Sequence, residues 1–390
     1  MSGPSSSASR RATALTAARR SWPLVVRRAQ AHDREAVLSF ATRTWDGWDY
    51  LPHAWPVWLE ADDGVLLVAS AGPPPDGSAA LDAEGELLEV GRPLAVARVA
   101  VLSESEAWLE GIRVDPRVRG MDVATDLQVA ELHWATAHGV AVLRYATGER
   151  NEASHRLGAR HGFELLAAFR TYWWAEPGSP DDAPGHDDED ESGFGEEARR
   201  QASALRAATL GRLGEASLIA SPGDAAAWWS RVSVDPTFVA AARLYEHRAW
   251  ALQELTEATF HRHVAAGEVV AMEADGGWAL AILERDALPS EDVSLHLGVL
   301  VGEGGPALRL APAIREAAGT SIRFRLPADE PALMRGQEEA FASAGFRARE
   351  WTLHILGRQL ETGEECRPGT AGLVLEDEPS PLARAPSGRR

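Results

Sequence analysis

The sequence predicts an α+β protein with two similar domains, each a central mixed and mostly antiparallel sheet flanked by helices. One basis for this prediction is the length, since 390 residues exceed one ordinary domain. Another is the order of patterns between residues 24 and 174, where short apolar runs are interspersed with stretches of helical periodicity. The same order of patterns returns between residues 269 and 356.

In the first half, apolar and β-branched runs predict strands, and apolar residues three or four positions apart predict helices. The predicted strands cover residues 24–28, 64–70, 93–102, 106–114, 141–147 and 163–174. The predicted helices begin at Asp33, follow the aromatic and acidic loop 45–52, and cover residues 122–138 and 151–161. Only residues 103–105 separate two of these strands, which predicts an antiparallel hairpin.

The second half repeats this layout after a segment rich in proline, glycine and acidic residues, which is typical of a solvated linker. Its predicted strands cover residues 269–273, 278–284, 293–301, 321–326 and 346–356, and its predicted helices run through residues 308–317 and 332–344. Gly298 and Gly345 stand where Gly111 and Gly162 stand in the first half. The matched order of elements favours a tandem duplication.

These patterns divide the chain into five parts. They are a disordered tail at 1–21, a first domain at 22–175, the acidic linker at 176–205, a second domain at 206–360 and a disordered tail at 361–390.

The composition excludes several classes of function. A net charge of −19 disfavours binding to nucleic acid or to an anionic membrane; it suits a cationic, amine-bearing substrate, although many acidic proteins are simply soluble. The one cysteine, Cys366, excludes an intramolecular disulfide and a cysteine-based zinc site. The chain has no lysine, which excludes a lysine nucleophile. No apolar run approaches the roughly 20 residues of a spanning helix, and we expect a cytoplasmic protein.

The stretch from Trp108 to Ala124 predicts an anion site. It combines an apolar strand, a break at Pro116, a turn with arginine and glycine, and the start of a helix. Such a turn presents free backbone N–H groups at the positive end of the helix dipole, an arrangement that favours phosphate. Asp122 is a good N-cap residue, and we expect its side chain to turn back onto these N–H groups.

Two segments resemble motifs of the GNAT superfamily of acetyl-CoA-dependent N-acetyltransferases. Arg119-Gly120-Met121-Asp122-Val123-Ala124 resembles the pyrophosphate turn Arg/Gln-x-x-Gly-x-Gly/Ala, with Asp122 in place of a glycine. Asn151 to Phe163 resembles the segment Asn-x-x-Ala-x-x-Leu-Tyr-x-x-x-Gly-Phe, with Ser154 in place of alanine and Gly158 in place of the tyrosine that often serves as general acid. The loop 46–52, Trp58 and residues 109–114 are similar to the histidine N-acetyltransferase branch, which implies a free amino acid or small amine as acceptor.

The resemblance implies that acetyl-CoA is the co-substrate and that its pyrophosphate lies over the turn. The residues it assigns to acetyl-CoA binding are Ile112, Val114, Arg119, Gly120, Met121, Asp122, Val123, Ala124 and Asn151. For Asn151, a helix N-cap is an equal alternative.

Glu110 occupies the position where several family members keep the base that deprotonates the amine. A carboxylate partly buried beside Trp108 suits this role, and a salt bridge with Arg98 is the structural alternative. Strict alternation along this strand would place Trp108, Glu110, Ile112 and Val114 on one face and Leu109, Gly111 and Arg113 on the other. Ser154, Tyr145 or a water could protonate the leaving thiolate.

The acceptor side is predicted from the loop before the first aromatic helix. Asp46, Asp49 and Tyr50 suit an ammonium or imidazole substrate through charge and cation–π contact, with an aromatic packing cluster as the alternative. The histidines show no spacing with carboxylates that favours a metal, so none is predicted.

The second half has lost these features, since Glu303 stands in the phosphate position and Leu300 replaces Arg113. We expect a degenerate copy that packs against the first domain and could cover the substrate cleft. The leading hypothesis is acetyl transfer to a primary amine by direct attack in a ternary complex. The alternative is a non-catalytic protein of the same fold that binds acetyl-CoA or acts as a regulator or scaffold. The oligomeric state stays open.

Overall fold

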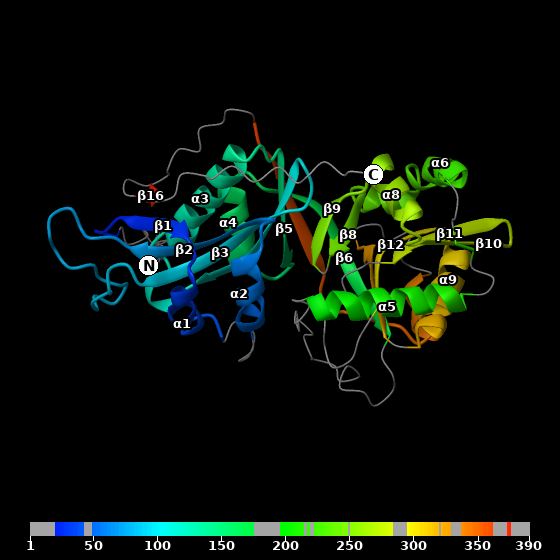
Figure 1. Cartoon of the computed structure of the whole chain (residues 1–390), viewed down its shortest axis with the longest axis horizontal. Helices are drawn as coiled ribbons and strands as arrows, with labels where there is room; N and C mark the ends of the chain where they lie inside the picture. Colours follow the sequence, from blue (N-terminus) through cyan, green and yellow to red (C-terminus); the bar gives the residue numbers. More distant parts are fainter. Residues whose placement is uncertain are drawn as a thin grey trace, which may run out of the picture.

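The computed structural model describes residues 20–42, 49–174, 196–213, 217–218, 222–248, 250–283, 295–319, 321–328, 337–361 and 373–375. One long mixed sheet runs through these residues, with helices over both of its faces (Figure 1). Its strands lie side by side in the order β16-β1-β2-β3-β4-β5-β15-β6-β13-β12-β11-β10-β7. The predicted α+β class is confirmed.

The first half of the chain forms one end of this sheet. Its strands are β1 (Leu24–Arg28), β2 (Gly64–Ala71), β3 (Pro93–Val101), β4 (Glu106–Val114), β5 (Val142–Gly148) and β6 (Glu164–Trp174). Its α-helices are α1 (Arg34–Leu38), α2 (Leu51–Glu60), α3 (Val123–Ala137) and α4 (Glu152–Arg160). These bounds agree closely with the predicted elements, because each element carries its own hydrophobic period and its own end signals.

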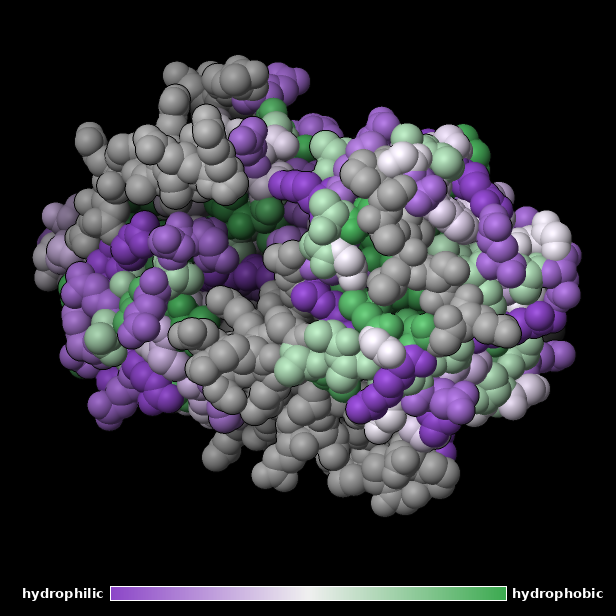
Figure 2. Space-filling model, turned by 45° about the vertical axis from the view of Figure 1, so that its right-hand side comes forward, coloured by the Kyte–Doolittle hydropathy of each residue, from purple (hydrophilic) through white to green (hydrophobic). Residues whose placement is uncertain are grey.

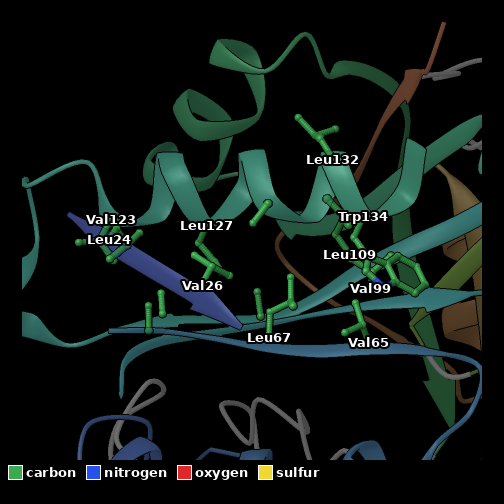
Figure 3. Close-up of a cluster of buried hydrophobic side chains, with 14 of the residues drawn as sticks. Leu24, Val26, Val65, Leu67, Val99, Leu109, Val123, Leu127, Leu132 and Trp134 are labelled. Carbon is green, nitrogen blue, oxygen red and sulfur yellow. The ribbon is translucent and has the colours of Figure 1, made fainter. Parts of the chain in front are cut away.

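Two helical layers enclose this end of the sheet. Leu127 of α3 is fully buried against one face, in a cluster with Val26 and Val99 (Figure 3). On the opposite face α2 buries Trp55 and Trp58. The first half therefore has a core on each side of its strands.

The second half forms the other end of the sheet. Its strands are β7 (Ser217–Leu218), β8 (Leu244–Arg248), β9 (Ala251–Glu254), β10 (Val269–Ala274), β11 (Gly277–Leu283), β12 (Leu295–Gly302), β13 (Ile322–Pro327), β14 (Arg347–Ala348), β15 (Leu353–Gln359) and β16 (Leu373–Leu375). Its described helices are α5 (Glu196–Arg212), α6 (Pro222–Val232), α7 (Pro236–Ala240), α8 (Glu257–Ala265), α9 (Gly304–Ala318) and α11 (Gln337–Ser343). The strand predicted at 346–356 is two strands, β14 and β15, and the unpredicted strands β8 and β9 form a separate hairpin.

The two halves exchange one strand each, β6 and β15. Strand β15 of the second half lies between β5 and β6 and runs antiparallel to both. Strand β6 of the first half pairs in turn with β13 of the second half. Each half is therefore completed by a strand of the other, and residues 22–175 and 206–360 share one sheet.

Parts of the chain that were expected to lack structure contribute to the fold. Helix α5 begins at Glu196, inside the predicted linker, and packs against α9. Strand β16, inside the predicted C-terminal tail, pairs in parallel with β1. Arg20, inside the predicted N-terminal tail, forms an ion pair with Asp126 and donates a hydrogen bond of 3.0 Å to the carbonyl of Met121. The rest of the two tails and residues 176–195 lie outside the described residues.

On the face shown in Figure 2, hydrophilic residues surround small apolar areas. Within the described part of the chain, no helix is both long and apolar enough to cross a membrane.

Candidate active site

A cavity of about 920 Å³ opens where β4 and β5 diverge. The two strands run parallel and pair over only three residues, from Glu106 opposite Val142 to Trp108 opposite Arg144. The walls come from β4, the turn before α3, the end of β5, α4 and two segments of the second half. The predicted site residues that line it are Tyr50, Glu110, Ile112, Val114, Arg119, Gly120, Asp122, Val123, Ala124, Asn151 and Ser154.

The turn between β4 and α3 has the geometry of an anion site. Asp115 starts it by accepting a hydrogen bond of 3.0 Å from the N–H of Arg117. Gly120 has a φ of +79°, and a Cβ there would meet no atom within 4 Å, so a ligand can approach the backbone closely. The first N–H groups of α3 have no acceptor within the helix, and they lie at its positive end. The N–H of Met121 does not join them as predicted, because it donates to the carbonyl of Val118 at 3.3 Å.

Asp122 does not cap α3 with its side chain, so this prediction was wrong. Its φ is +59°, and the side chain makes no capping hydrogen bond. A capping side chain needs an extended backbone to reach the N–H groups of the first turn, and a left-handed residue directs its side chain elsewhere. The carboxylate instead lies 3.6 Å from the Nη1 atom of Arg160 at the end of α4. Its negative charge is thus balanced by a neighbouring helix.

Three arginines line this end of the cavity, Arg119, Arg156 and Arg160. The latter two come from α4 and were not predicted. They are four residues apart and therefore share one helix face, which is the signal in the sequence that could have revealed them. Arg156 pairs with Glu152 at 2.8 Å, as Arg160 does with Asp122 at 3.6 Å, but both guanidinium groups are largely exposed and can reach a bound anion. The turn and α4 together form a cationic end of the cavity.

A β-bulge at Gly111 overturns the predicted facing of β4. Gly111 and Ile112 together oppose the single residue Ala97 of β3. Gly111 has a φ of +74°, and a Cβ there would collide with the ring of Trp58. Ile112 consequently packs on the α3 side of the sheet, whereas Glu110 lies with the groups that pack on Trp58 of α2. Strict alternation had placed Glu110 and Ile112 on one face.

Glu110 lies on the cavity wall between two guanidinium groups. Its Oε1 atom accepts hydrogen bonds from Arg98 and, at 3.1 Å, from Arg248 of β8. Asp63 forms ion pairs with the same two arginines. The salt bridge to Arg98 that was the structural alternative for Glu110 is therefore present. Within the described part of the chain, these contacts all involve Oε1 and none involves Oε2.

Tyr145 of β5 fills the space above Gly158 of α4. Its hydroxyl donates a hydrogen bond of 3.1 Å to the carbonyl of Ser154, and a Cβ at Gly158 would overlap that hydroxyl. Burial raises the pKa of the Tyr145 hydroxyl to about 12, so the group stays protonated at neutral pH. Tyr145 and Ser154 both line the cavity. Asn151 is the N-cap of α4, since its side chain accepts a hydrogen bond of 3.2 Å from the N–H of Ser154.

Asp49 and Tyr50 differ in their relation to the cavity. The side chain of Asp49 is completely buried, and its Oδ2 atom accepts a hydrogen bond of 2.7 Å from Nε of Arg113. Tyr50 lines the cavity, and the guanidinium of Arg113 lies 5.0 Å from the centre of its ring. Asp49 also accepts a hydrogen bond of 2.9 Å from the N–H of Leu51, so it holds Arg113 and the start of α2, and of the two residues only Tyr50 lines the cavity. Asp46 lies outside the described residues.

The second half supplies cavity walls that were not predicted. Trp250 follows β8, and Trp351 and Leu353 lie at the start of β15. No element was predicted around Trp250, and the position of Trp351 depends on the strand exchange. These residues carry no local signal of a site.

A buried carboxyl group also faces the cavity without having been predicted. Glu131 of α3 is 2% exposed and lines the cavity beside Gln128. Burial raises the pKa of Glu131 well above its ordinary value. The Oε1 atom of Gln128 is buried without a hydrogen-bond partner among the described residues.

The second half has no comparable space at its corresponding strand. Strand β12 also bulges at a glycine, Gly298, but a Cβ there would strike the carbonyl oxygen of Glu246. The cavity beside it holds only about 20 Å³. A single residue, Glu303, separates β12 from α9, whereas residues 115–122 separate β4 from α3. The loop that forms the anion site is absent from the second half.

Within the described residues no group of three or more histidine, cysteine, aspartate or glutamate side chains is placed to hold a metal ion.

Residues 41–163 match the model of the acetyltransferase (GNAT) family. The matched segment contains the turn, the bulged strand and α4, and it identifies this part of the chain as an acyltransferase domain. No curated protein matches the chain.

Several solved structures are similar to the chain at low identity. A structure from Thermoplasma acidophilum has 14% identity and a TM-score of 0.47, and the match covers 86% of this chain and 99% of that one. A GCN5-related N-acetyltransferase from Sphaerobacter thermophilus has 15% identity and a TM-score of 0.42, with 86% and 95% covered. A GCN5-related N-acetyltransferase from Kribbella flavida has 14% identity and a TM-score of 0.39, with 87% and 72% covered.

Proposed function

We propose that the protein transfers an acetyl group from acetyl-CoA to a primary amine of a small molecule or amino acid. The observation that carries this proposal is the cavity between β4 and β5. It has an anion-binding turn and three arginines at one end and the carboxylate of Glu110 at the other. A family match over the same residues supports acetyl-CoA as the co-substrate.

The cationic end is proposed to hold the pyrophosphate of acetyl-CoA. The N–H groups of Gly120, Val123 and Ala124 would donate to the phosphate oxygens, and Arg119 would add charge. The pantetheine arm would follow the backbone of β4 at Ile112 and Val114, and Asn151 would contact it from the other wall. The bulge at Gly111 interrupts the ladder of β4, which supports the use of backbone groups there by a ligand.

The chemistry is proposed to proceed by direct attack of the amine. The amine nitrogen forms a bond to the thioester carbon, and the C–S bond of the tetrahedral intermediate then breaks. Glu110 accepts the proton that the nitrogen loses, either directly or through water. The thiolate of CoA takes a proton from the hydroxyl of Ser154 or of Tyr145, both of which line the cavity, and the Tyr145 hydroxyl donates to the backbone carbonyl of Ser154. The only cysteine of the chain, Cys366, lies outside the described residues, and the proposal includes no covalent enzyme intermediate.

We infer further that the second half is a degenerate copy of the first. The order of strands and helices from β11 to β15 repeats the order from β3 to β6, and β4 and β12 each bulge at a glycine. The proposed domains, 22–175 and 206–360, would then be duplicated units that have exchanged a strand. The second unit would serve to complete the acceptor side of the first.

The proposal is tested in two steps. Acetyl-CoA should raise the apparent melting temperature, because a ligand that binds only the native state stabilises it. Thiol release with a panel of amines should then fall by about a hundredfold or more in Glu110→Gln, which is the usual contribution of a general base. Asp63→Asn is the matched control, because it removes a carboxylate from the same two arginines outside the cavity wall. Equal rates in wild type and Glu110→Gln would exclude Glu110 as the base.

A second candidate function is binding of acetyl-CoA without catalysis. It is favoured by the two ion pairs of Glu110, which compete with its use as a base. Stabilisation by acetyl-CoA with no thiol release for any amine would support this alternative.

A further inference from the structure

The end of the cavity around Glu110 has an aromatic and apolar wall built by both halves of the chain. Trp108 and Tyr50 come from the first half, and Trp250, Trp351 and Leu353 come from the second. Trp108, Trp250 and Leu353 belong to one buried cluster that bridges the two halves. Such a wall favours an apolar ligand body, because the apolar surface of that body leaves water on binding.

Trp250 is held in place by charged groups of the second half. Its φ of +66° is a strained conformation for a bulky residue and persists only where the surroundings impose it. Its N–H donates a hydrogen bond of 2.6 Å to Glu246, and the guanidinium of Arg325 lies 4.4 Å from the centre of its ring. Glu246 also pairs with Arg325 and with His296. These groups occupy the position that is open in the first half.

The docking of the hairpin β8–β9 fixes Trp250 relative to β4. At one end Arg248 donates to Glu110 at 3.1 Å, and at the other the N–H of Glu254 donates to Glu106 at 3.2 Å. The indole N–H of Trp250 is buried without a hydrogen-bond partner among the described residues.

Trp351 lies just before β15, and a second set of contacts, between its neighbour Thr352 and Glu149 after β5, holds it in place. Thr352 donates a hydrogen bond of 2.7 Å to Glu149, and the N–H of Glu149 donates to the carbonyl of Thr352 at 3.0 Å. The guanidinium of Arg349 lies 5.0 Å from the centre of the Trp351 ring. The two indoles therefore form rigid walls, each with an arginine stacked on it.

The charges near Glu110 disfavour a second cation on the acceptor. Arg98 and Arg248 both approach its carboxylate, and Asp63 pairs with the same two arginines, so the two carboxylates are balanced and leave no spare negative charge for a second ammonium group. An acceptor with two ammonium groups would bring the second one toward these guanidiniums or toward the indoles already stacked by arginines. A single amine on an apolar body avoids this repulsion.

We infer that the acceptor is a primary amine attached to an aromatic body and that Trp250 and Trp351 of the second half determine this specificity. The inference rests on the proposed acetyl transfer and specifies its acceptor class. The aromatic ring packs between Trp108 and the two indoles, and the amino group reaches Glu110. The second half thus acts as the specificity wall of the first.

The test compares phenethylamine, n-butylamine and putrescine as probes, with thiol release for turnover and calorimetry for binding. In wild type, kcat/KM for phenethylamine should exceed that for putrescine by at least about tenfold. Trp250→Ala and Trp351→Ala should each raise the KM for phenethylamine by about tenfold, with kcat and the KM for acetyl-CoA unchanged. Trp250→Phe should restore most of the affinity. Trp228→Ala is the control, since Trp228 lies in the second half away from the cavity and contacts Arg231.

The outcomes separate the inference from the function on which it rests. Preference for putrescine, or an equal loss for all three amines in Trp250→Ala, would overturn the aromatic acceptor and leave acetyl transfer standing. Binding of phenethylamine that depends on Trp250, without thiol release for any amine, would overturn acetyl transfer and keep the aromatic site. Because the wild-type comparison needs no variant, poor folding of Trp250→Ala does not remove the test.

Discussion

The two halves share a bulged strand followed by a helix, yet among the described residues the space beside the bulge differs greatly between them. In the first half the space beside the bulge at Gly111 continues into a cavity of about 920 Å³. In the second half the backbone of Glu246 fills the space beside Gly298, and about 20 Å³ remains. The first half also has residues 115–122 between strand and helix, where the second has only Glu303.

This difference separates the parts of the fold that hold the sheet together from the parts that bind. The glycine bulge is kept in both halves, so by itself it does not mark a ligand site. What distinguishes the first half is the loop with free N–H groups, the arginines of α4 and the divergence of β4 from β5. In the second half a buried carboxylate, Glu246, is paired with Arg325 and His296, and the space is used to support Trp250.

The largest predicted effect is a loss of affinity for acetyl-CoA when the charge of Arg119, in the turn between β4 and α3, is reversed. Arg119→Glu should raise the Kd for acetyl-CoA by roughly ten- to a hundredfold, because one charge-assisted hydrogen bond is lost and repulsion is added. Arg309→Glu is the matched control, since Arg309 lies on the exposed face of α9, the corresponding helix. Calorimetry measures both. Equal losses in the two variants would show that the effect reflects overall charge and not the turn.

The second prediction contrasts the buried carboxyl groups of the two halves. Burial raises the pKa of Glu131 in the folded state, so the folded protein binds this proton more tightly than the unfolded chain does. The free energy of unfolding of the wild type should therefore fall as the pH rises above the pKa of the unfolded chain. Glu131→Gln removes this loss. The variant should therefore gain stability over wild type at about pH 8 and not at about pH 4, measured by urea unfolding.

Glu246→Gln, in the second half, is compared with Glu131→Gln in the same urea unfolding experiment. It should destabilise the protein at neutral pH, because it leaves Arg325 without its buried counter-charge. A pH-independent difference between Glu131→Gln and wild type would contradict the role assigned to burial at Glu131.

A smaller effect is expected at Asp122. Asp122→Gly removes a left-handed non-glycine residue, which costs about 1 kcal/mol, and removes a carboxylate from the cationic end of the cavity. The Kd for acetyl-CoA should fall several-fold. Ala242→Gly relieves a similar φ of +52° in the second half and should raise stability without changing the Kd. Weaker binding of acetyl-CoA by Asp122→Gly would mean that the carboxylate of Asp122 helps the turn to bind acetyl-CoA.

The sequence predicted those features that depend on neighbouring residues. The strands and helices of the first half, the turn at Gly120 and the N-cap of α4 at Asn151 follow from local periodicity and end signals. The facing of Glu110 and Ile112 could not be predicted, because the extra residue at Gly111 shifts the register by one and reverses all side chains beyond it.

Contacts between distant segments were also beyond prediction. Arg248 meets Glu110 only because the hairpin β8–β9 docks on β4, and Trp351 reaches the cavity only because β15 enters the sheet beside β5. Neither segment has a composition that points to a site. Asp122 was expected to be an N-cap from its residue type, and its left-handed backbone, which the residue type does not reveal, gave it a different partner in Arg160.

The exchange of β6 and β15 sets the order in which the chain can fold. The edge of β5 stays unpaired until residues 353–359 have been synthesised, so the sheet of the first half cannot close while the second half is still being made. Pairings between strands so far apart in the sequence make folding slow and leave apolar edges open during synthesis. The half that holds the cavity is therefore completed only after most of the second half has been made, and β15 pairs with β5 in the same event that brings Trp351 and Leu353 to the cavity wall.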